Sequence, residues 1–148
     1  MVRSLVLATA FVGGLMAVVP AQADALLDGL SLMPGAVDDV RIAGTWEQGN
    51  QTGAYRVVIA RTVGEAVTAR LFVQWIAYHD DGSTTVDKTI EINELADLKV
   101  DIVDYTSQSD VDGLSVFIQT LDPNGKSDQN YELFVTSPTE YRFGPASN

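Results

Sequence analysis

The sequence contains no cysteine and a single histidine, His79, in 148 residues. Without a thiol, the chain can form neither a disulfide nor a thiolate metal site, and it has no cysteine nucleophile. A catalytic triad or a histidine-ligated metal would have to use His79, which lies beside Asp80 and Asp81 in a turn-forming segment. A water-excluding active site is hard to build at a hairpin tip, so we expect a protein that is not an enzyme and carries no cofactor.

Basic residues are also scarce, with 9 Lys and Arg against 20 Asp and Glu, which gives a net charge of −11 at pH 7. An acidic surface repels nucleic acid and anionic lipid. We therefore expect neither of these among the partners of the chain.

The one long apolar run lies at the start of the chain. Arg3 supplies a positive charge, residues 5–19 are apolar, and residues 21–23 read Ala-Gln-Ala, which matches an A-x-A cleavage site. We expect residues 1–23 to be a signal peptide that is removed, with no membrane insertion afterwards. Eight basic residues then face 20 acidic ones, a charge of −12. An exported chain without cysteine suits a bacterial periplasm or medium, so we predict a periplasmic or secreted protein.

Strand patterns fill residues 38–143, between an N-terminal arm or short helix at residues 24–37 and a tail at residues 144–148. The clearest pattern lies in residues 66–77, where Trp75 belongs to an apolar series at alternate positions. This segment is expected to be a central strand, with Trp75 as its large core residue and Trp46 packing near one end.

Turn-forming residues recur roughly every 8 to 12 positions, as in all-β sandwiches and barrels. Residues 93–97 are expected to form one helical turn or a wide loop, and residues 106–113 a polar loop. The fold prediction is a single-domain, all-β, antiparallel sandwich of immunoglobulin-like style with seven or eight strands. A small closed β-barrel of lipocalin-like type is the alternative.

The second face of the strands carries the candidate site. Aromatic and polar side chains alternate with the core positions of two neighbouring strands, and the residues concerned are Arg56, Arg70, Phe72, Gln74 and Tyr78. Aromatic rings beside guanidinium donors suit a sugar or a protein partner. The structural alternative is a register change at a bulge, or a cover formed by residues 24–37.

Two acidic residues, Asp110 and Asp112, precede Gly113 in the expected polar loop. Their oxygen atoms suit Ca²⁺, but the segment lacks the bidentate Glu at the twelfth position of a full calcium loop. The sequence leaves open whether this loop binds calcium, and we assign no metal site.

Gly44-Thr45-Trp46 resembles the G-x-W signature of lipocalin-like and avidin-like barrels, and Arg142 lies where those barrels place an arginine against that tryptophan. The resemblance covers these two points only, and no helix pattern follows Arg142 as in a lipocalin. It implies a barrel in which Trp46 closes the base, with a ligand-holding or protease-inhibitor role.

The sequence thus favours an exported, non-catalytic binding or interaction module of unknown ligand. Its partner would be a protein or a carbohydrate, held on the aromatic and arginine face, and the chain could form a homo-oligomer. The alternative is a lipocalin-like barrel that holds a small apolar ligand or acts as a protease inhibitor.

Overall fold

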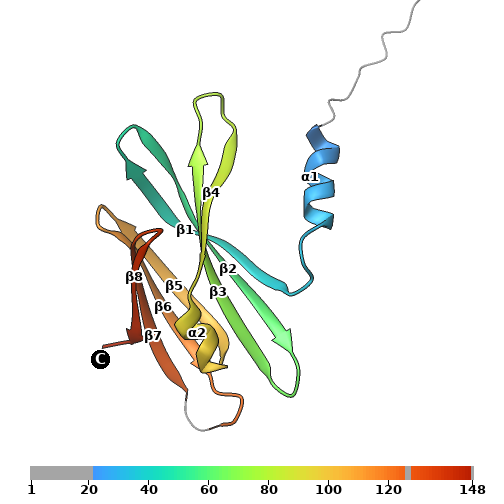
Figure 1. Ribbon diagram of the computed structural model, residues 1–148, viewed down its shortest axis with the longest axis vertical. Coiled ribbons are helices and arrows are strands. Elements are labelled where there is room, and N and C mark those ends of the chain that lie inside the picture. The colour runs from blue at the N-terminus through green and yellow to red at the C-terminus, as the bar shows by residue number, and fades with distance from the viewer. Residues whose placement is uncertain (1–21, 126–127, 148) are drawn as a thin grey trace, which may run out of the picture. The chain divides into compact units, whose positions relative to one another are not determined.

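The computed structural model describes residues 22–125 and 128–147 of the chain (Figure 1). It divides into two compact units, Met1–Met33 and Pro34–Asn148, each of which is described by itself.

The first unit contains α1 (Gln22–Ser31), whose residues Leu26, Leu27 and Leu30 are exposed. The expected signal peptide, residues 1–23, lies outside the described residues except for its last two positions, which begin α1. Of the helices in the described part of the chain, none has the length and apolar character that a membrane span requires.

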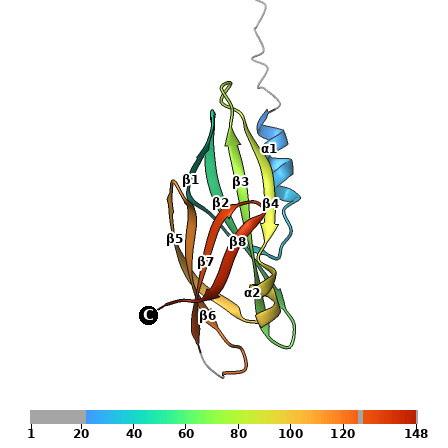
Figure 2. The same cartoon turned by 60° about the vertical axis from the view of Figure 1, so that its left-hand side comes forward.

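The second unit contains eight strands and one short helix. In chain order these are β1 (Val37–Gln48), β2 (Gln51–Val63), β3 (Val67–Tyr78), β4 (Thr84–Glu91), α2 (Asn93–Leu98), β5 (Asp101–Asp110), β6 (Gly113–Leu121), β7 (Gln129–Ser137) and β8 (Glu140–Pro145). Strands β1 to β4 form one antiparallel sheet, sheet A, and strands β5 to β8 form another, sheet B. Figure 2 shows the two sheets as separate layers.

The predicted all-β sandwich is confirmed, and the barrel alternative is wrong because the two sheets do not close into a barrel. Within each sheet the strands lie in the order of the sequence, so each sheet is a meander of four neighbours. An immunoglobulin domain instead passes strands between its sheets through Greek-key connections. The chain therefore shares the layered architecture of that class, with simpler connections.

Strand β3 shows why this sequence forms strands. Leu71, Val73 and Trp75 point into the core and are 0%, 0% and 7% exposed, while Arg70 on the opposite face is exposed. Alternation of this kind buries one side of a pleated strand and leaves the other side outward. Because β3 lies between β2 and β4, its prediction as a central strand is confirmed.

Helix α2 links the two sheets and fills the space beside β3. Leu95 of α2 is fully buried, and so is the preceding Ile92, whose amide donates to the carbonyl of Leu71 at 3.0 Å. The hydroxyl of Tyr141 on β8 donates to a carboxylate oxygen of Glu94 at 2.7 Å. Of the two expectations for this segment, the helical turn is correct.

Strand β5 corrects one expectation, because residues 106–110 of the expected polar loop continue the strand. Tyr105 is the last buried residue of β5; beyond it Ser107 is exposed and Ser109 is half-buried, where an aliphatic residue would have signalled a strand. A strand at a sheet edge needs less apolar surface than a central one, so the polar composition resembled that of a loop.

Strands β1 and β5, the first strand of each sheet, lie close together and are joined by polar contacts. Arg41 of β1 forms an ion pair of 3.2 Å with Asp104 of β5, and the amide of Thr45 donates to the hydroxyl of Ser109 at 3.0 Å. Gly44 has a φ of +141°, and a Cβ atom there would overlap the side chain of Ser109. Glycine is thus required for the two strands to approach so closely.

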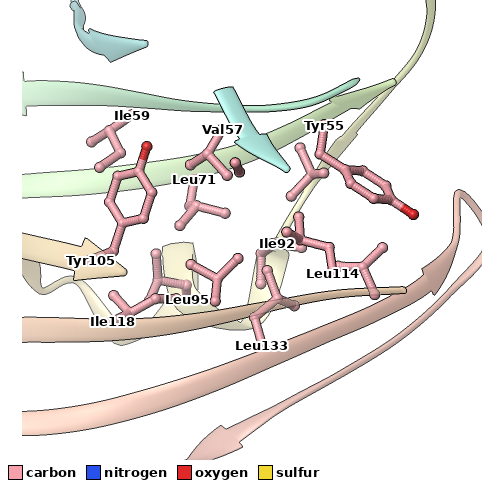
Figure 3. Packing of buried hydrophobic residues seen from close by; sticks show 14 of the residues in the cluster. Tyr55, Val57, Ile59, Leu71, Ile92, Leu95, Tyr105, Leu114, Ile118 and Leu133 are labelled. Carbon is pink, nitrogen blue, oxygen red and sulfur yellow. The ribbon is translucent and has the colours of Figure 1, made fainter. Parts of the chain in front are cut away.

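The core lies between the sheets and consists mainly of fully buried aliphatic side chains, including Ile59, Leu71 and Leu133 (Figure 3). Two tyrosines lie at opposite ends of the labelled cluster. Tyr105 turns its hydroxyl toward Ile59, whereas Tyr55 turns its hydroxyl away from the aliphatic side chains. The hydroxyl at the Tyr105 end of the core therefore faces apolar side chains, whereas the hydroxyl at the Tyr55 end does not.

The hydroxyl of Tyr105 is enclosed without a hydrogen-bond partner among the described residues. Burial raises the pKa of Tyr105 from 10.0 to about 12; Asp39 adds to the rise and Arg41 opposes it. Because the folded pKa lies above the unfolded value, the unfolded chain ionises first. This contribution to stability is complete below pH 10.0 and is lost as the pH rises to about 12.

We predict that Tyr105→Phe leaves the free energy of unfolding at neutral pH unchanged or raises it by about 1 kcal/mol, since it removes an unsatisfied hydroxyl. The variant should also lose less stability than the parent between pH 10.0 and about 12. Urea unfolding over a pH series measures both effects. A clear loss of stability at neutral pH would show that the hydroxyl has a partner.

Candidate functional site

The five residues singled out from the sequence lie together on the outer face of sheet A. Arg56 of β2 is opposite Gln74 of β3, and Phe72 and Arg70 follow on the same side of β3. Tyr78 lies at the end of β3 and is 49% exposed. The structure therefore brings together residues from two neighbouring strands, as the alternating pattern indicated.

Several of these side chains bind one another across the sheet. Arg56 donates from Nε to Oε1 of Gln74 at 2.7 Å, and Gln74 donates from Nε2 to the hydroxyl of Thr89 at 3.0 Å. Arg70 forms two hydrogen bonds of 2.6 Å with the carboxylate of Glu91. This contact holds the pKa of Glu91 below its usual value. Hydrogen bonds thus fix the polar side chains across three strands.

The ring of Phe72 is covered by its neighbour. The guanidinium carbon of Arg70 lies 5.0 Å from the centre of the ring, within the range of a cation–π contact. Phe72 is half-buried, so little of its ring is open to a flat ligand. Tyr78 is the more accessible aromatic residue of this face.

Aliphatic side chains surround the hydrogen-bonded polar residues of this face. Val40 and Ile42 of β1 are 43% and 63% exposed, and Val86 of β4 is 49% exposed. Half-buried Val58 lies between them on β2. With the five residues above, these side chains form what we call the sheet A outer face, a mixed apolar and polar surface that extends over all four strands.

The outer face of sheet B carries a similar pair, because the guanidinium of Arg142 lies 5.2 Å from the centre of the Phe134 ring. Arg142 and Phe134 are directly paired between β8 and β7. The expected contact of Arg142 with Trp46 is therefore wrong. The closed barrel that would bring the ends of the chain together is not formed.

A concave region lies at one end of the sandwich, among the β1–β2 hairpin, the β5–β6 hairpin and the β7–β8 turn. This end pocket has a volume of about 650 Å³. Trp46, Tyr55 and Trp75 form its aromatic wall, and Asp110 and other polar side chains line the remainder. Its size is typical of a pocket for a small molecule.

The aromatic wall is tightly packed. Tyr55 and Trp75 meet edge to face, with ring centres 5.7 Å apart and planes at 73°. The indole of Trp46 donates to the carbonyl of Ala54 at 3.3 Å. Gly53 lies opposite Trp46 and makes room for the indole, since a Cβ there would stand 2.6 Å from the ring.

The sequence indicated the burial of Trp46 and Trp75, which are 9% and 7% exposed, but not the pocket that they line. The pocket is formed by hairpins that are far apart in the chain, so no short sequence motif predicts it. The clustering of Trp46 with Gly44 and Gly53, two glycines inside strands, was the available signal for a close approach of backbones.

The segment from Asp110 to Gly113 is the tight end of the β5–β6 hairpin. The amide of Asp112 donates to the carboxylate of Asp110 at 2.8 Å, which is ordinary turn geometry. Among residues 22–125 and 128–147, no group of three or more His, Asp or Glu side chains is arranged to hold a metal ion. The Asp110 carboxylate accepts within the turn, and both residues line the end pocket.

Comparison of this chain with family models, with curated proteins and with solved structures finds no match. The candidate sites therefore depend on the geometry alone.

We predict that Gly53→Ala lowers the free energy of unfolding by about 1–3 kcal/mol, because the added methyl group would press on Trp46 and on the carbonyl of Ile76. Tryptophan fluorescence should shift toward that of an exposed indole. Gly64→Ala is the matched control, since a Cβ there meets no atom within 4 Å. If both variants unfolded at the same urea concentration as the parent, the packing of Trp46 on Gly53 would be refuted.

Proposed function

We propose that this protein is an exported, non-catalytic binding module that docks a protein partner on the sheet A outer face. The supporting observation is an arginine without a matching acid. In a chain of net charge −11, Arg56 forms no ion pair with the described carboxylates and lies among apolar side chains. The proposal of export rests on the signal-peptide pattern of residues 1–23.

The other arginines of sheet A are neutralised within the chain. Arg41 pairs with Asp39 and Asp104, and Arg70 pairs with Glu91. Arg61 pairs with Asp38 of β1 and Asp101 of β5. Among these four arginines, Arg56 has no carboxylate partner among the described residues and donates to the amide oxygen of Gln74. A half-buried guanidinium gains from a carboxylate, so a partner that presents one would complete this contact.

The chemistry of the face favours a protein over a carbohydrate. Sugars stack on open aromatic rings, but the ring of Phe72 is covered by Arg70. Most of the exposed apolar surface is aliphatic, with Ile42 the most exposed of the group at 63%. An apolar centre with an arginine is typical of protein–protein interfaces. The partner is thus expected to offer an acidic residue within an apolar surface.

A catalytic role receives no support from His79. Its Nε2 atom lies 2.9 Å from the hydroxyl of Thr85, which in turn donates to Asp87 at 2.7 Å, and all three side chains are exposed. An exposed chain of this kind lacks the enclosed setting that general base catalysis requires. The exposure of His79 supports the proposal of a binding function.

Photo-crosslinking in the native host tests the proposal. A benzophenone amino acid placed at Ile42 should form an adduct with one partner protein, because this side chain is 63% exposed on the proposed interface. The same probe at Gln119, on the outer face of sheet B, should not form that adduct. Mass spectrometry of the adduct identifies the partner.

Charge reversal supplies the matched control. Arg56→Glu should abolish the Ile42 adduct, while Arg142→Glu, which reverses an exposed arginine on sheet B, should leave it intact. Neither change should alter the melting temperature by more than a few degrees. An adduct that persists in Arg56→Glu would contradict the proposal. An adduct of twice the chain mass would replace the expected partner with a second copy.

A further inference from the structure

We propose that the end pocket is a second binding site, separate from the sheet A outer face, and that its ligand is a neutral saccharide. The pocket has a volume of about 650 Å³. A volume of this size can hold one or two sugar rings. Its lining combines aromatic rings, hydroxyl groups and carboxylates.

One hydroxyl in the pocket lacks an acceptor for its proton. Tyr55 is only 5% exposed; the indole of Trp75 is the hydrogen-bond donor beside its hydroxyl oxygen, and no acceptor for the hydroxyl proton is found among the described residues. The hydroxyl of Tyr55 is not among the fully enclosed unpaired atoms of the described residues, and Tyr55 lines the pocket, so we take the hydroxyl to open into it. A hydroxyl proton that finds no acceptor in the protein is available to water or to a ligand in the pocket.

The hydroxyl of Tyr55 is also kept neutral. Burial raises its pKa above the ordinary value, the negative charge of Asp110 raises it further, and the indole of Trp75 offsets part of the rise. Tyr55 therefore remains a hydrogen-bond donor throughout the neutral range. A ligand atom beside it should carry an oxygen lone pair.

The remaining polar groups complement this donor. Glu47, Asp110 and Asp112 line the pocket, and none of its lining residues is basic. Carboxylates accept hydrogen bonds from hydroxyl groups, and an acidic lining repels anions. Ser109 and Ser137 add hydroxyls that both donate and accept. A ligand that is uncharged and carries donors and acceptors on all sides matches this set, and saccharides have that character.

The pocket is also held in shape before any ligand arrives. The contact of Thr45 with Ser109, at 3.0 Å, joins the two hairpins at its base. The turn formed by Asp110 and Asp112 fixes the β5–β6 hairpin, and the edge-to-face contact of Tyr55 with Trp75 fixes the aromatic wall of the pocket. A preformed site loses less entropy on binding than a flexible loop does.

Intrinsic fluorescence provides a direct readout, because both tryptophans of the chain, Trp46 and Trp75, line the pocket. We would titrate the full chain with glucose, galactose, N-acetylglucosamine, cellobiose and maltose, and separately with ethylamine and inorganic phosphate. The expected result is a saturable change in emission with at least one sugar and none with phosphate. Sugar binding should be insensitive to salt, whereas binding of an amine should weaken as salt is added.

Tyr55→Phe is the decisive variant, since it removes one hydroxyl and preserves the packing on Trp75. It should weaken sugar binding about tenfold, the usual value of one hydrogen bond, with an unchanged melting temperature. Tyr105→Phe removes an unpaired hydroxyl outside the pocket and should leave the affinity unchanged. This pair separates loss of a ligand contact from a general effect on the core.

The proposal is overturned if no sugar in the panel changes the emission at millimolar concentration, or if Tyr55→Phe binds as tightly as the parent. Saturable, salt-sensitive binding of ethylamine alone would assign the pocket to cations instead. These outcomes are independent of the crosslinking result at Ile42, so the two sites can fail separately.

Discussion

The close approach of β1 to β5 is the constraint on which the rest of the second unit depends. These two strands belong to different sheets, and no backbone ladder joins them. Side-chain contacts do so instead, through Arg41 with Asp104 and through Thr45 with Ser109. Gly44 permits the approach because any side chain there would collide with Ser109. The sandwich is thus closed along one side by polar contacts and a missing Cβ atom, and along the other by α2.

This closure also determines where binding surfaces can form. Because the contact between β1 and β5 brings the β1–β2 hairpin beside the β5–β6 hairpin, Trp46, Tyr55 and Asp110 line one pocket at the end of the core. The sheet A outer face does not depend on the contact between β1 and β5, since its side chains point away from the core. A flat surface and a hollow are therefore built from opposite faces of the same strands, and they suit ligands of different size.

The sequence predicted those parts of the fold that follow from local alternation. Val73 and Trp75 lie in a strand with one buried face, so their pattern was clear, and the placement of Arg56 and Gln74 on one outer face followed from it. The second half of β5 was missed because its residues are polar; its half-buried Ser109 meets Gly44 of the other sheet. The pocket could not be read from the chain, since Trp46 and Asp110 are brought together only by the packing of the two sheets. Long-range proximity leaves no periodic signal in a single sequence.

The order of the strands has a consequence for how the molecule assembles. Every strand pairs only with its neighbours in sequence, so each ladder can begin from a short hairpin, with little loop entropy to overcome. Sheet A can complete its hydrogen bonding before the last third of the chain is available, and α2 then marks the point at which the second layer starts. A polypeptide that emerges N-terminus first, from a ribosome or a translocation channel, can thus form its strand pairs one after another before its C-terminal residues have emerged.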